Sequence, residues 1–185
     1  MKILGISSSP RPNSNSKYAL EQAIDFLKEN NVECEIIDID KLDIKCCRGC
    51  DYCKSHEAKC VIPDDMQEIY EKLKTCDGFI LTSPIYMAQL SAQAKIFMDR
   101  LYAYFMSNWT DKYGSKKVAM LITQGQPGKE LYKANIENYK FNFEEIVKFD
   151  VIGYEVLTEN NQAGIIKDKP EQIEEAVSLA KLFLE

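Results

Sequence analysis

The architecture follows from the N-terminal stretch Lys2-Ile3-Leu4-Gly5-Ile6-Ser7-Ser8-Ser9-Pro10-Arg11-Pro12-Asn13-Ser14-Asn15-Ser16. Residues 2–7 are mostly apolar and end in serine, which is typical of a short buried strand. Apolar residues then recur at positions 20, 23, 24 and 27, the spacing of one helix face. The stretch therefore predicts a strand that leads through a polar loop into a helix.

The same alternation continues along the chain. Further strands are predicted at 32–40, 77–83, 117–123 and 150–158, and further helices after Pro63, at 91–104, at 135–149 and after Pro170. Asp64 is the expected N-cap of the second helix, and Pro84 is expected to stop the third strand. Five strands alternating with five helices are typical of a parallel sheet with helices on both faces. We expect one α/β domain over residues 1–185, with a Cys-rich loop at 46–60.

Composition excludes several classes of protein. Apolar residues make up 45% of the 185 residues and charged residues 28%, which excludes a disordered chain. A formal net charge of −6 argues against a general nucleic-acid binder, because phosphate neutralisation needs a basic surface. The chain has no apolar run near the roughly 18 residues of a membrane span and no signal-peptide pattern at Met1. We expect a soluble, cytoplasmic protein without nucleic-acid or membrane partners.

The loop after the first strand carries hydroxyls, one guanidinium (Arg11) and the start of a helix. Neither Gly-x-Gly-x-x-Gly nor Gly-Lys-Ser/Thr occurs there, which argues against a Rossmann dinucleotide site and a P-loop. Hydroxyls, a guanidinium and free helix N–H groups suit a phosphate monoester, so a mononucleotide is the natural ligand. The alternative is an ordinary Ser/Asn/Pro loop that caps a helix.

Two further loops follow predicted strands at the same edge of the sheet. They are Thr82-Ser83-Pro84-Ile85-Tyr86-Met87 and Thr123-Gln124-Gly125-Gln126-Pro127-Gly128. Their backbone N–H groups, one aromatic ring and permissive glycines suit a flat polar heterocycle. The alternative is that the tyrosine packs on its neighbours and that the glycines only make turns.

In this order, Ser9-Pro10-Arg11, Ser14-Asn15-Ser16, Ser83-Pro84-Ile85-Tyr86, Lys95 and Asp99-Arg100 resemble the NADPH-dependent FMN reductase superfamily. The resemblance runs over nearly the whole chain and is densest over residues 1–101. It implies a flavodoxin-like three-layer sandwich whose five-stranded parallel sheet has the order 2-1-3-4-5, and bound FMN. It also implies roles for the loop residues. The phosphate is expected on Ser9, Arg11, Ser14, Asn15 and Ser16, and the isoalloxazine on Pro84, Ile85, Tyr86 and Met87, with Thr123, Gln124 and Gly125 at its other side.

Five of the seven cysteines lie within residues 46–60, and four of them have the spacing Cys47-x2-Cys50-x2-Cys53-x6-Cys60. The two x2 spacings also begin the ligand run of bacterial ferredoxins. Within the superfamily the pattern resembles the iron-sulfur flavoproteins, which implies a [4Fe–4S] cluster on these four cysteines. Ligation by Cys46 instead of Cys47, a zinc ion, and an empty or redox-active loop stay open. Cys34 and Cys76 are expected to be packing thiols.

The resemblance implies a flavin-dependent oxidoreductase. Electrons would pass between a ferredoxin-like or NAD(P)H donor and a small-molecule acceptor, and no catalytic side chain is assigned. The alternatives are an NAD(P)H-dependent FMN or quinone reductase without a cluster, and a non-catalytic, metal-stabilised binding module. Large apolar side chains crowd residues 103–114, which suggests either local packing or an interface that closes the flavin pocket. The resemblance implies a homodimer or homotetramer.

Overall fold

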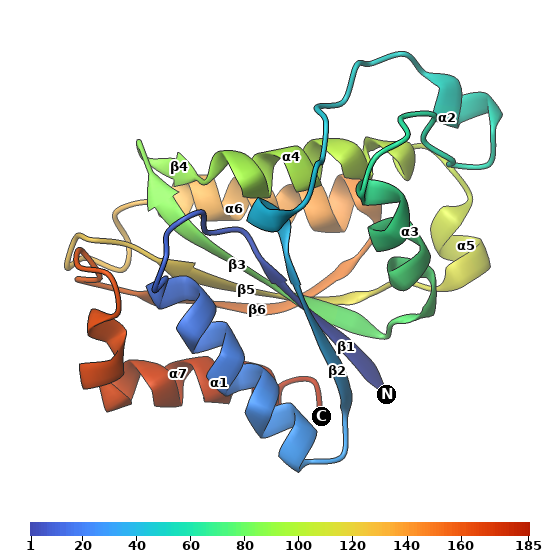
Figure 1. Ribbon diagram of the computed structural model, residues 1–185. Helices are drawn as coiled ribbons and strands as arrows, with labels where there is room; N and C mark the ends of the chain where they lie inside the picture. The colour runs from blue at the N-terminus through green and yellow to red at the C-terminus, as the bar shows by residue number, and fades with distance from the viewer.

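A parallel sheet forms the centre of the computed structural model, which describes all residues 1–185 (Figure 1). Its parallel strands are β1 (Lys2–Ser7), β2 (Glu33–Asp38), β3 (Gly78–Tyr86), β5 (Lys117–Thr123) and β6 (Asp150–Leu157). They lie in the order β2-β1-β3-β5-β6, which is the expected 2-1-3-4-5 order when the parallel strands are counted along the chain. A sixth, short strand, β4 (Gln89–Leu90), pairs with β3 in antiparallel orientation. The expected α/β class is confirmed, and β4 is an addition to the expected five strands.

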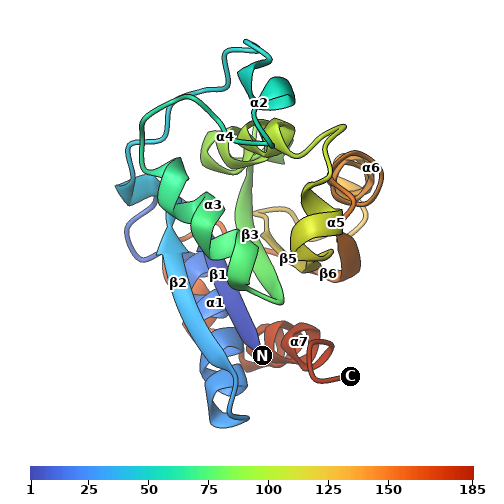
Figure 2. The same cartoon turned by 90° about the vertical axis from the view of Figure 1, so that its right-hand side faces the viewer.

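Helices cover both faces of the sheet, as the alternating pattern predicts (Figures 1 and 2). One face carries α1 (Asn15–Glu29) and α7 (Pro170–Lys181), and the other carries α3 (Met66–Thr75), α4 (Ala92–Arg100), α5 (Trp109–Tyr113) and α6 (Lys133–Phe141). The single-turn α2 (Tyr52–Ser55) lies in the Cys-rich loop, which projects beyond α4 in Figure 1. Short 3-10 turns occur at Ile39–Lys41, Leu101–Ala103 and Ile165–Asp168, and a π turn at Asn142–Val147 ends α6 earlier than the sequence predicts.

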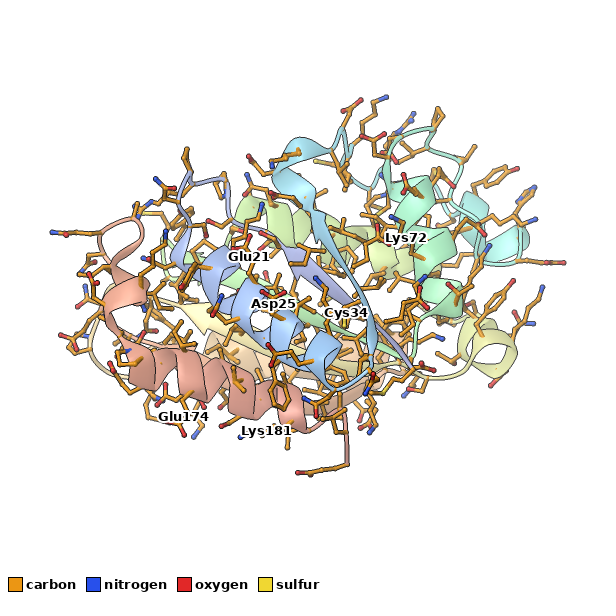
Figure 3. All side chains as sticks on the ribbon, turned by 60° about the horizontal axis from the view of Figure 1, so that its bottom comes forward. Glu21, Asp25, Cys34, Lys72, Glu174 and Lys181 are labelled. Atoms are coloured by element: carbon orange, nitrogen blue, oxygen red, sulfur yellow. The ribbon has the colours of Figure 1, made fainter.

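Successive strand residues point to opposite faces, so each central strand contributes to two cores. In β1, Leu4 and Ile6 join the larger apolar cluster under α3–α6, whereas Ile3 joins the cluster under α1 and α7. The charged side chains of α1 point away from the core. Figure 3 shows Glu21 and Asp25 on the outer side of α1.

The third strand does not stop at Pro84, contrary to the sequence prediction. It continues to Tyr86, and Pro84 lies opposite Thr123 of β5. Pairing of β1 with β3 has already ended at Ser7 and Thr82, so Pro84 has a strand on one side only. A proline is tolerated there because no neighbouring strand needs a hydrogen bond from its backbone nitrogen.

The hairpin between β3 and β4 was not predicted. Met87 and Ala88 connect its strands and both have positive φ angles, of 48° and 64°. Two-residue hairpin turns of this kind usually contain Asn or Gly, which tolerate positive φ. The Met-Ala pair carries no such signal, which is why the sequence pattern did not reveal the turn.

Two of the large side chains in residues 103–114, Tyr104 and Trp109, pack inside the protein. Trp109 and Tyr104 are buried and stack on each other with ring centroids 4.1 Å apart, and Trp109 also contacts Phe149. Met106 is an exposed exception. The local-packing interpretation of this segment therefore describes Trp109 and Tyr104. None of the helices is long and apolar enough to cross a membrane.

We expect Phe97→Ala to destabilise the protein by about 3–5 kcal/mol, because truncation of a buried aromatic side chain leaves a cavity. Phe97 is fully buried and meets Phe79 edge to face. Phe141→Ala is the matched control, since that side chain is 53% exposed, and we expect a change below about 1 kcal/mol. Urea unfolding of both variants measures the difference. Equal losses would contradict the assignment of Phe97 to the core.

Candidate cofactor and cysteine sites

A cavity of about 220 Å³ lies where β1, β3 and β5 end. Eleven of the twelve side chains that the sequence analysis assigned to FMN line it, together with two asparagines that the analysis did not assign. The lining residues are Ser9, Arg11, Ser14, Asn15, Ser16, Pro84, Ile85, Tyr86, Thr123, Gln124, Gly125, Asn160 and Asn161. The twelfth residue, Met87, lies outside the cavity at the tip of the hairpin, where its side chain is 98% exposed. Three loops far apart in sequence thus meet at one edge of the sheet.

The loop after β1 presents donors to this cavity. Ser14 is the N-cap of α1, and its Oγ accepts the N–H of Lys17 at 3.2 Å. The first N–H groups of a helix have no partners within the helix, so the start of α1 favours an anion. Arg11 lies above it with an exposed guanidinium that donates to the carbonyl of Asn161 at 3.0 Å.

Asn15 and Ser16 already have partners inside the protein. The Asn15 amide donates to the carbonyls of Asn160 (3.1 Å) and Gln162 (2.7 Å), so it holds the loop after β6 beside the start of α1. Ser16 Oγ and Thr123 Oγ1 lie 2.6 Å apart and link α1 to the end of β5. These two residues hold the walls of the cavity together, and their predicted contacts with the phosphate stay a prediction.

Buried hydroxyl groups connect the ends of β1 and β3 with the start of α4. Ser91 is the N-cap of α4, and its Oγ donates to the carbonyl of Ser8 at 2.7 Å. Ser83 Oγ accepts the Ser91 N–H at 3.0 Å, and Ser8 Oγ donates to the carbonyl of Thr82 at 2.7 Å. Because these bonds are buried, they fix the two loops relative to each other.

In the loop after β5, the cavity wall is formed by close packing of Gly125 against Asn161. A Cβ at Gly125 would lie 1.9 Å from Oδ1 of Asn161, whose Nδ2 donates to the Gly125 carbonyl at 2.9 Å. Gln124 and Asn160 each carry a buried side-chain oxygen without a hydrogen-bond partner. Unpartnered acceptors on cavity-lining residues fit a ligand that brings hydroxyl or N–H donors, as FMN does. The residues present therefore fit this cofactor.

Asn160 and Asn161 are the cavity residues that the sequence analysis missed. They follow β6 after two residues, in the run Asn160-Asn161-Gln162. The rule that ligands bind beyond the carboxyl ends of parallel strands applies to this strand as well. A polar run after the last strand was therefore a usable signal.

The four cysteines of the predicted cluster line a second, small pocket. Its walls contain Cys47, Arg48, Cys50, Asp51, Cys53, Cys60, Val61, Ile62, Arg100, Tyr102 and Ala103. The neighbouring Cys46 is exposed and is not part of this lining. Nowhere in the structure do three or more His, Cys, Asp or Glu side chains form a group that could hold a metal ion. The donor set of four thiols around one pocket fits an iron-sulfur cluster, whose ligands surround a larger object than one ion.

A buried ion pair lies beneath this pocket. The side chains of Arg100 and Asp64 are both 0% exposed, and Arg100 Nη2 donates to Asp64 Oδ1 at 3.1 Å. Burial alone would raise the pKa of Asp64, but hydrogen bonds from Arg100 and the Lys45 N–H outweigh it and hold the pKa below its ordinary value. The prediction that Asp64 is the N-cap of α3 is wrong, because this helix begins at Met66 and Asp65 is its N-cap. Asp64 lies one residue earlier, where its carboxylate accepts the Met66 N–H at 3.1 Å and pairs with Arg100.

The outer part of the cysteine loop is attached to the chain after α4. Tyr102 donates from its hydroxyl to Asp51 at 2.8 Å, and the Lys54 ammonium lies 4.0 Å from the centre of the Tyr102 ring. Lys54 Nζ also donates to the carbonyl of Tyr102 at 2.6 Å. Asp51 and Lys54, which lie on either side of Cys53 in the sequence, thus bind the loop to Tyr102.

The remaining two cysteines lie away from this loop. Cys76 is buried, and burial raises the pKa of its thiol to about 11. Cys34 lies on the edge strand β2, as Figure 3 shows, and packs against the apolar cluster under α1. Both positions agree with the expected packing role.

The two sites lie at opposite ends of α4. Ser91 at its start belongs to the hydroxyl network beside the first cavity, whereas Arg100 at its end lines the cysteine pocket. Nine residues at 1.5 Å per residue separate the ends of this helix by roughly 13 Å. One short helix therefore sets the spacing between the sites (Figure 1).

Comparison with known proteins finds related sequences among iron-sulfur flavoproteins. An iron-sulfur flavoprotein of Methanocaldococcus jannaschii is 44% identical over 100 residues, which are 54% of this chain and 51% of that relative. A second iron-sulfur flavoprotein of the same organism is 36% identical over 125 residues, 68% of this chain and 62% of the relative. The matched segments thus span between about half and three-fifths of the length of these relatives.

Among solved structures, an NAD(P)H:quinone oxidoreductase from Methanothermobacter marburgensis superposes with a TM-score of 0.70 over 98% of both chains. At 18% identity this likeness shows the shared fold alone. The family model described as NADPH-dependent FMN reductase matches residues 1–132, which include the loops after β1, β3 and β5 and the cysteine loop. The chain therefore belongs to the NADPH-dependent FMN reductase family, a family of flavin-dependent oxidoreductases, and is similar within it to iron-sulfur flavoproteins.

Proposed function

We propose that this protein is an FMN-binding oxidoreductase of the iron-sulfur flavoprotein type. The observation that carries the proposal is the convergence of three sequence-distant loops on one cavity at the carboxyl edge of the sheet. Family membership supports FMN as the ligand of that cavity. The names of the curated relatives and the four-cysteine pocket support an additional [4Fe–4S] cluster.

The phosphate of FMN would bind at the start of α1. There Ser9 and Ser14 supply hydroxyls, Arg11 supplies a charged donor, and the helix supplies free N–H groups. Asn15 and Ser16 would position this cradle through their bonds to the loops after β6 and β5.

The ring system would lie between the loops after β3 and β5. Pro84, Ile85 and Tyr86 form one wall, and Gly125 lets the backbone of the other wall approach closely. Met87 could contact a ring only if the exposed hairpin tip bent toward the cavity. When bound, FMN accepts a hydride and releases electrons singly, and the residues around it hold and orient it.

In the cysteine pocket, Cys47, Cys50, Cys53 and Cys60 would hold the cluster, which carries one electron at a time. A ferredoxin-like protein or NAD(P)H is the proposed donor and a small molecule such as a quinone the acceptor. A homodimer or homotetramer stays a prediction. The second candidate is an FMN or quinone reductase whose cysteine loop holds no cluster, since the matched family model is that of NADPH-dependent FMN reductases in general.

We expect Arg11→Gln to weaken FMN binding by roughly 10- to 100-fold, because a charge-assisted hydrogen bond is worth about 1.5–3 kcal/mol. Riboflavin lacks the phosphate, so its affinity should change less than about twofold. Fluorescence titration with both flavins measures this. Lys28→Gln removes the same charge from the far end of α1 and serves as the control. Equal weakening of FMN and riboflavin by Arg11→Gln would contradict the phosphate role.

We expect Gly125→Ala to weaken FMN binding about tenfold or more, because the new methyl group would displace Asn161 from the cavity wall. The control is Gly128→Ala in the same loop, where a Cβ would have no neighbour within 4 Å. The same titration reports both affinities. If the two variants bind FMN alike, the wall around Gly125 does not contact the cofactor.

The cluster proposal predicts that Cys50→Ser abolishes about four irons per chain in protein prepared without air, while Cys46→Ser keeps them. Both side chains are exposed in the same loop, so the pair is matched in position. Iron and sulfide analysis together with the visible spectrum provides the measurement. A yellow wild-type protein without iron would instead support the cluster-free reductase.

A further inference from the structure

Arg100 is the only arginine or lysine in the structure whose side chain is buried against a cysteine sulfur of the loop. Its Nη2 lies 3.4 Å from Cys60 Sγ and donates to it, and its Nη1 donates to the carbonyl of Lys45 at 2.8 Å. Asp64 accepts from both terminal nitrogens. The remaining donor, Nε, is buried without a partner.

These contacts reach both ends of the cysteine loop. Lys45 directly precedes the loop, and Cys60 ends it. Asp64 reinforces the first end, since its Oδ2 accepts the Lys45 N–H at 2.9 Å. Gln67 reinforces the second end, since its Nε2 donates to the carbonyls of Cys60 at 3.0 Å and Ile62 at 2.7 Å. One guanidinium thus joins the two loop ends to α4.

The cost of this arrangement suggests a specific purpose. Burial of an arginine and a carboxylate removes both from water, and a buried ion pair is weak evidence for stability. Arginine keeps its proton at any physiological pH, so the guanidinium stays charged although it is buried. A permanently charged donor is therefore held against the sulfur of Cys60.

We propose that Arg100 is a positioning residue for the iron-sulfur cluster: it holds Cys60 at the pocket and donates a hydrogen bond to that ligand's sulfur. The inference rests on the proposed cluster and goes beyond it. Hydrogen bonds to the sulfurs of a cluster raise its reduction potential, because they stabilise the more negative, reduced state. Asp64 opposes this effect, since its negative charge compensates the arginine.

The test compares Arg100→Lys with Asp64→Asn in protein reconstituted with iron and sulfide without air. Lysine keeps the charge but, with one nitrogen, cannot reach both Asp64 and Cys60 as the guanidinium fork does. We expect Arg100→Lys to shift the cluster potential to more negative values. Asp64→Asn leaves the cation uncompensated, so we expect a shift in the opposite direction. A redox titration followed by electron paramagnetic resonance measures both.

Arg48→Lys is the matched control, because Arg48 lines the same pocket but makes no hydrogen bond to a cysteine. Its potential should equal that of the wild-type protein. A second readout is the rate at which a chelator removes iron, which should rise at least several-fold in Arg100→Lys and stay unchanged in Arg48→Lys. Thermal unfolding of the iron-free variants shows whether the fold survives.

The outcomes separate the two proposals. Wild-type protein that binds no iron after reconstitution would overturn the proposed cluster itself. Full iron content in all variants with unchanged potentials and release rates would overturn the role of Arg100 and leave the cluster in place. Shifts of the same sign in Arg100→Lys and Asp64→Asn would also overturn it, because they would indicate general loosening of the loop.

Discussion

The registers of β1 with β3 and of β3 with β5 are the constraint on which the proposed flavin site depends. Ser7 pairs with Thr82, and Pro84 pairs with Thr123, so the three strands end within a few residues of each other. The polar segments that follow therefore meet in space although more than 110 residues separate Ser9 from Gln124. Buried hydrogen bonds of serine hydroxyl groups then hold the ends of β1 and β3 together. The three loops therefore line one cavity in the structure as it stands.

The helix α4 connects this edge of the sheet with the cysteine loop. Its N-cap, Ser91, bonds to Ser8 beside the proposed flavin cavity, and its last residue, Arg100, bonds to both ends of the cysteine loop. A helix is stiff over nine residues, so the distance between the two sites is a property of the fold rather than of the loop. The loop itself has little regular structure, and side chains attach it: Asp64, Arg100, Lys54 and Tyr102.

The burial of the ion pair beneath the cysteines explains why an irregular, thiol-rich loop can hold a defined shape. Such a loop buries few apolar groups of its own, because Cys46, Arg48 and Cys50 are exposed. Its ends are held instead by charge-assisted hydrogen bonds in a dry environment, where each bond is stronger than in water. The same dryness makes the loss of either partner costly, since the other would stay buried and charged.

The sequence by itself determined the α/β class and the loops that carry the residues of the cavity and of the cysteine pocket, whereas the order of the parallel strands came from the family resemblance. Hydrophobic periodicity and polar segments after strands are local patterns, so they can be read without coordinates. Only the tertiary structure decided that β3 runs through Pro84, that Met87 and Ala88 make a hairpin turn, and that Asn160 and Asn161 complete the cavity. It alone placed Arg100 against Cys60, because contacts between residues 40 positions apart depend on how α4 and the loop pack and not on local preference.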